Sequence, residues 1–113
     1  MSGERVSRVE DFIRREISAI ILHEINDERF KALNITAVRC SSDLSSAKVY
    51  YKNSNQAAHE PIPEVAFKRF TSLLRTKLAK SLTTKRVPRL ILEEDQALDN
   101  FTRISSLLDS INE

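Results

Sequence analysis

A chain of 113 residues is long enough for one domain with a real core and too short for a separate catalytic module. Its single Cys excludes an internal disulfide and a multi-cysteine zinc site, and its single Gly, at position 3, excludes Gly-rich phosphate loops. The net charge of +2 hides an asymmetry, because residues 65–92 contain eight Lys and Arg and no acid, so the remainder sums to −6.

Apolar side chains recur at helical spacing from Arg5 to Ile25, which predicts a long amphipathic first helix. Its polar side, which includes Arg8, mixes both signs of charge as solvated helix faces do. Asn26 follows, and because Asn tolerates left-handed dihedrals we expect it to cap this helix.

Alternating apolar and polar residues predict two strands, over 33–41 and 47–52, and the short turn between them requires an antiparallel hairpin. The polar row of the second strand, Lys48, Tyr50 and Lys52, places an aromatic ring between two cations, which suits RNA. A strand tyrosine is more often a cross-strand packing partner, so both interpretations stay open.

The helical pattern returns at Glu64 and runs to about Leu82. Thr71 and Ser72 lie in its middle, where their hydroxyls compete for backbone partners, so we expect the helix to be kinked or split there. The apolar stripe of this helix contains Phe67, Phe70, Leu74, Leu78 and Leu82.

Val87-Pro88 is an extended dipeptide that introduces a third strand over 90–92, and Asp95 precedes a last helix or tail over 96–113. The resulting order predicts a single α+β domain over residues 1–113, with a three-stranded sheet backed by helices. This order matches the type II K-homology (KH) arrangement of RNA-binding domains, although the usual Gly-x-x-Gly clamp is absent.

The acid-free stretch predicts a polyanionic partner, because an ordinary solvated face interleaves both signs of charge. We expect the four Lys and Arg at positions 68, 69, 77 and 80 to point away from the apolar stripe. The candidate RNA contacts are Arg8, Lys48, Lys52, Lys68, Arg69, Arg75, Lys77, Lys80, Lys85, Arg86 and Arg89.

Nothing in the sequence predicts an enzyme, a metal site or a cofactor. His23 and His59 lack a partner nucleophile, Cys40 is expected to face inward on a strand, and the neighbouring acids at 93–95 converge poorly on a cation. No apolar run approaches a membrane span, and we expect a cytoplasmic, monomeric protein without a membrane partner.

An ordered set of short motifs runs through nearly the whole chain. They are Arg8-Val9, Arg15-Glu16-Ile17, Asp27, Arg29, Val38, Ser41 to Leu44, Ala47-Lys48-Val49-Tyr50, Arg75, Val87-Pro88, Leu90, Asp95, Arg103-Ile104 and Leu107-Leu108. In this order they resemble the ribosome-binding factor A family of bacterial small-subunit assembly factors. The resemblance implies a KH-like domain that binds the immature small (30S) ribosomal subunit, aids maturation of its ribosomal RNA without catalysis, and is often needed for growth in the cold.

Two other classes of function stay open. The central helical passage would act as a DNA-binding helix-turn-helix module if it divided into two helices. Alternatively, the acidic last helix would dock a basic ribosomal protein.

Overall fold

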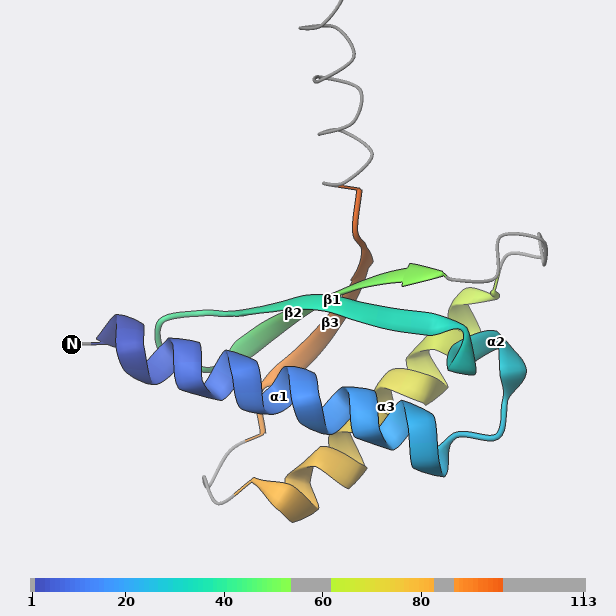
Figure 1. The fold of residues 1–113 in the computed structure, drawn as a ribbon, viewed down its shortest axis with the longest axis horizontal. Coiled ribbons are helices and arrows are strands. Elements are labelled where there is room, and N and C mark those ends of the chain that lie inside the picture. The colour runs from blue at the N-terminus through green and yellow to red at the C-terminus, as the bar shows by residue number, and fades with distance from the viewer. Residues whose placement is uncertain (1, 54–61, 83–86, 97–113) are drawn as a thin grey trace, which may run out of the picture.

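The computed structural model describes residues 2–53, 62–82 and 87–96. Most of the predicted last helix or tail, from residue 97 onward, lies outside this range. Figure 1 shows the elements, which are α1 (Ser2–Glu24), α2 (Glu28–Lys31), β1 (Leu33–Cys40), β2 (Ser46–Asn53), α3 (Glu64–Ser81) and β3 (Arg89–Glu94).

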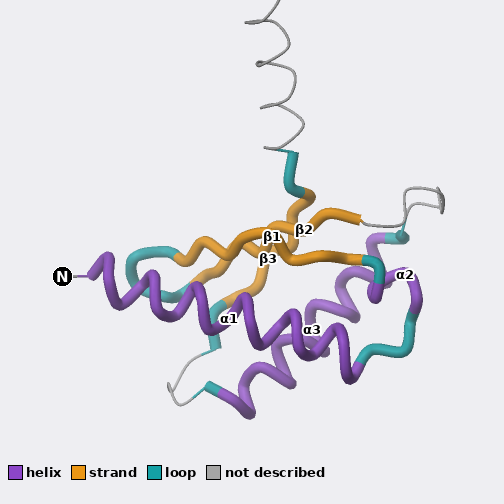
Figure 2. Tube along the Cα trace, viewed as in Figure 1, coloured by secondary structure: helices purple, strands orange, loops and turns teal. Residues whose placement is uncertain are grey.

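The three strands form one sheet in the order β1-β2-β3 (Figure 2). β1 and β2 pair antiparallel, as the predicted hairpin requires, and β2 and β3 pair parallel. Parallel neighbours need a long crossover connection, and the chain between β2 and β3 contains α3. The predicted α+β architecture is therefore confirmed.

One face of the sheet packs against both long helices. Val49 on β2 and Leu90 on β3 are buried in the same core as Ile17 from α1 and Leu74 from α3. The alternate residues of β2, including Lys48, point to the opposite face because successive strand side chains alternate. Neither α1 nor α3 is apolar enough over its length to cross a bilayer.

A four-residue helix, α2, follows α1 and was not predicted, because one turn is too short to show a period. Asp27 caps it by accepting a 3.0 Å hydrogen bond from the backbone N–H of Arg29. The ring of Phe30 stacks 4.1 Å from that of Phe70 and so fixes α2 on α3. The predicted left-handed cap at Asn26 is wrong, since Leu44 alone among the described non-Gly residues has a positive φ.

The central helix α3 runs without a break, so the prediction that it is split is wrong; a kink stays a prediction. The Thr71 hydroxyl does donate to the carbonyl oxygen of Phe67 at 2.8 Å, but a hydroxyl bonded back in this way leaves the helix continuous. The buried stripe at Phe70, Leu74 and Leu78 holds α3 on the core over its length.

Asp43 organises the turn between β1 and β2. Its Oδ1 atom accepts 2.7 Å hydrogen bonds from the hydroxyls of Ser45 and Ser41, and a 3.1 Å bond from the backbone N–H of Ser45. These donors lower the pKa of the Asp43 carboxyl from 3.8 to about 2. The turn thus holds one end of the hairpin beside the start of β3, where the Arg89 N–H donates to the Ser45 carbonyl at 2.9 Å.

Candidate nucleic-acid interface

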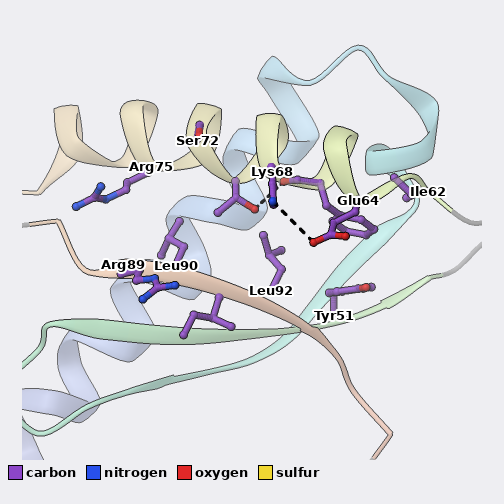
Figure 3. Close-up of a pocket in the computed structure, with 12 residues that line it drawn as sticks. Tyr51, Ile62, Glu64, Lys68, Ser72, Arg75, Arg89, Leu90 and Leu92 are labelled. Carbon is purple, nitrogen blue, oxygen red and sulfur yellow. Dashed lines mark hydrogen bonds and ion pairs between the residues drawn. The ribbon is translucent and has the colours of Figure 1, made fainter.

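A groove lies between the exposed side of α3 and the edge strand β3 (Figure 3). Lys68 and Arg75 line it from α3, and Arg89 lines it from β3. Leu92 provides apolar surface between these cations, beside the almost fully buried Leu90. Two elements far apart in sequence therefore bring three of the predicted contacts to one concave surface.

The two α3 cations in the lining of this groove, Lys68 and Arg75, make different contacts within the protein. The Nη2 atom of Arg75 donates to the carbonyl of Val87 at 3.1 Å, just before β3 begins. The Lys68 ammonium lies 3.9 Å from the Glu64 carboxylate, with both side chains more than three-quarters exposed. An exposed pair at this distance is weak in water, so Lys68 stays available to an anion.

Two hydroxyl residues, Ser72 and Thr76, extend the polar lining of this surface toward Ser45 in the β1–β2 turn. Sequence reasoning missed them as site residues. Ser72 follows Lys68 by four residues and Thr76 follows Ser72 by four, and this spacing was the available signal, because residues four apart share a helix side. The Ser72 hydroxyl and the guanidinium groups can donate hydrogen bonds to phosphate oxygens, whereas the Thr76 hydroxyl already donates to the Ser72 carbonyl at 3.0 Å.

The structure corrects the predicted orientation of Lys77. Its side chain is only 24% exposed, and its ammonium lies 2.8 Å from the carboxylate of Glu24 at the end of α1. This hydrogen bond is the main reason that the pKa of Glu24 is lowered. Lys77 therefore faces α1 and is engaged within the protein.

Arg69 and Lys80 are exposed, as predicted, but Arg69 lines a different groove from Lys68. That second groove is largely apolar and contains Val65, Leu73 and Phe30. The cations of α3 thus lie on more than one side of the helix.

The other predicted contacts lie elsewhere. Lys48 and Lys52 alternate with the buried residues of β2 and so lie on the sheet face away from the helices. Arg8, near the start of α1, pairs with Glu4 at 3.0 Å. Lys85 and Arg86 lie outside the described residues.

The one thiol of the chain is poorly suited to nucleophilic chemistry. Cys40 is partly buried, and desolvation together with the nearby Glu10 carboxylate raises the pKa of its thiol to about 11. The thiolate is the reactive form of a cysteine. Because the pKa is this high, little thiolate exists at neutral pH.

Comparison with known proteins gives one family. A model of the ribosome-binding factor A family matches residues 5–108. Ribosome-binding factor A of Heliobacterium modesticaldum is 36% identical over 108 residues, which cover 96% of this chain and 89% of that protein.

Solved structures of the same family share the fold. The crystal structure of ribosome-binding factor A from Thermus thermophilus is 27% identical, with a TM-score of 0.67 over 81% of this chain and 97% of that chain. A homology model of the T. thermophilus factor, fitted into a cryo-electron-microscopy map of a 30S complex, is 27% identical, with a TM-score of 0.61 over 79% of this chain and 93% of that one. These proteins have a KH-like fold, which confirms the predicted fold class.

Proposed function

This chain belongs to the ribosome-binding factor A family, and from that premise we propose that it binds the immature small ribosomal subunit and promotes maturation of small-subunit ribosomal RNA. It acts in the cytoplasm as a non-enzymatic assembly factor, with residues 1–113 forming one RNA-binding domain. The T. thermophilus factor that has been placed in a 30S complex is similar to this chain in both sequence and fold, which supports the proposal.

The groove between α3 and β3 is the observation that carries this proposal. Lys68, Arg75 and Arg89 present three positive charges along it, and the Ser72 hydroxyl adds a neutral donor. Phosphates on the folded RNA backbone accept from all of these groups, and binding them releases condensed counterions. Recognition then depends on the contour of the sugar-phosphate backbone, because the chain lacks the Gly-x-x-Gly loop that holds four nucleotides in other KH domains.

The remaining predicted cations contribute outside this groove. Exposed Arg69 and Lys80 add positive charge on other sides of α3. Lys77 contributes least, because Glu24 neutralises it. The contacts proposed in addition are Arg8, Lys48, Lys52, Lys85 and Arg86.

The helix-turn-helix alternative is not favoured. A recognition helix must be free to enter a major groove, with a short turn before it. α3 is one helix, and Phe70, Leu74 and Leu78 bury its side along the core. The alternative in which the last helix docks a ribosomal protein concerns residues outside the described part of the chain.

Co-sedimentation with immature small subunits tests the proposal. The double variant K68E/R89E reverses two exposed cations of the groove, and it should pellet at least ten-fold less with the subunit than the unmodified protein. Its melting temperature should be close to that of the unmodified protein, because both side chains are exposed.

A matched control reverses two exposed cations away from the groove. R14E/K31E makes the same change in net charge on α1 and α2, so it separates a local contact from a general effect of charge. The control should keep most of the binding. Equal losses in the two double variants would remove the groove from the proposal, and failure of the unmodified protein to pellet would refute subunit binding itself.

A further inference from the structure

The sheet face that points away from the helices carries two cations directly opposite each other. Arg39 on β1 pairs in register with Lys48 on β2, and both are exposed. Like charges at such a cross-strand position destabilise a sheet, because their Cβ atoms lie only about 5 Å apart. A protein stabilised only by its own contacts gains nothing from this pair, whereas an anion bound between the two would be held by both.

The two cations of this pair differ in their contacts with carboxylates of the protein. Arg39 lies 3.9 Å from the Glu10 carboxylate, at the outer limit of an ion pair, and its side chain is 71% exposed. Among the described residues Lys48 has no ion-pair partner. The β3 residue beside Lys48 is the apolar Ile91, and the carboxylate of Glu93 lies two residues further along β3, beside Tyr50.

Tyr50 lies on the same face, two residues along β2 from Lys48 and therefore about 7 Å away. It is half-buried, and its register partners are the small Ala37 on β1 and Glu93 on β3. An aromatic side chain on a sheet face, two residues from a cation, is an arrangement on which unpaired RNA bases can stack.

This face is continuous with the groove proposed above. Arg89 pairs in register with Ser46, which is two residues before Lys48 on β2, and Arg89 also lines the groove between α3 and β3. An RNA strand that leaves the groove at Arg89 therefore meets Lys48 and Arg39 next.

We propose that Arg39, Lys48 and Tyr50 form a second RNA contact that takes an unpaired nucleotide, with its base on the Tyr50 ring and its phosphate between the two cations. This inference rests on the proposed function and adds a preference for single-stranded RNA to the backbone recognition of the groove. Duplex RNA fits poorly, because its bases are already stacked on one another.

Fluorescence anisotropy with a labelled 12-nucleotide oligouridylate tests the inference. Y50F keeps the ring and should bind as the unmodified protein does, whereas Y50L keeps the apolar bulk without the ring and should bind about ten-fold more weakly. K48T should bind several-fold more weakly at low salt while its melting temperature stays equal or rises, because the like-charge pair is removed. K31T on α2 removes one exposed charge elsewhere and should change neither quantity much.

The outcomes separate this inference from the proposed function. Equal binding of oligouridylate by Y50L and Y50F, or unchanged binding by K48T, overturns the second contact even if the unmodified protein pellets with the small subunit. A K48T variant that loses both binding and melting temperature also overturns it, since Lys48 would then be a structural residue. If Y50L does not fold, the K48T result decides the matter. Absence of pelleting by the unmodified protein overturns the proposed function instead.

Discussion

The Lys77 ammonium lies 2.8 Å from a carboxylate oxygen of Glu24, which joins the last turn of α1 to α3 across 53 residues of sequence. The two helices already share one core, through residues such as Ile17 and Leu74. The ion pair adds a polar contact at the edge of that core. From the sequence alone, its cation, Lys77, is expected to be exposed to solvent.

Replacing Lys77 by Met should lower the melting temperature slightly at pH 7 and leave RNA affinity nearly unchanged. The hydrogen bond from Lys77 lowers the pKa of Glu24, so its stabilisation is present above the ordinary pKa of 4.5 and is lost as the pH falls through the lowered value. The difference in melting temperature between K77M and the unmodified protein should therefore shrink from pH 7 to pH 3. K31M, which removes an exposed cation on α2, is the control for both measurements. A K77M loss of affinity as large as that of K68M would show that Lys77 contacts RNA after all.

Leu74 and Leu73 are neighbours on α3 with opposite surroundings. Leu74 is fully buried, whereas Leu73 is 42% exposed. Leu74→Ala should reduce the free energy of unfolding by about 2 to 5 kcal/mol, because a cavity is left among packed side chains. Leu73→Ala should cost much less by the same urea-denaturation measurement, and equal losses would contradict the burial of the stripe.

Because of Asp43, we expect the stability of the protein to fall as the pH is lowered through the acid range. Its carboxyl has a pKa of about 2 in the folded protein against 3.8 ordinarily, so its contribution is complete above about pH 5 and disappears as the pH falls toward 2. Asp43→Asn should destabilise the protein at pH 6, and the deficit should close as the pH falls from 4 to 2. Urea denaturation across this range measures it, and a deficit that is independent of pH would point to lost packing or geometry instead of the charge.

The salt dependence of subunit binding should report how many phosphates the groove contacts. The logarithm of the binding constant falls linearly with the logarithm of the salt concentration. Each phosphate contact makes this slope steeper by about 0.7 to 0.9. K68Q/R89Q should therefore flatten the slope by about 1.4 to 1.8 if each side chain meets one phosphate. Titrations between 50 and 300 mM KCl, roughly the range over which such losses are large, measure it. If the variant bound more weakly at every salt concentration but kept the same slope, these two residues would have a role other than phosphate contact.

The sequence by itself determined the elements of the fold and their order. Helical and alternating periods are local properties of the chain, so α1, the hairpin, α3 and β3 follow from the spacing of apolar residues. The short turn required an antiparallel pair, and the long connection through α3 suited the parallel pair that the sheet contains. The four-residue α2 escaped prediction because it is held by its Asp27 cap and by Phe30 on Phe70, and neither contact leaves a period.

Only the tertiary structure decided which cations share a surface. Periodicity places Lys77 on the polar side of α3, but whether that side meets solvent or Glu24 depends on where α1 packs. In the same way, Arg75 and Arg89 become neighbours in one groove only because β3 returns beside α3, and Arg39 meets Lys48 only through the register of two strands. A sequence period fixes the direction of a side chain relative to its own element, whereas its partners come from the packing of that element against others.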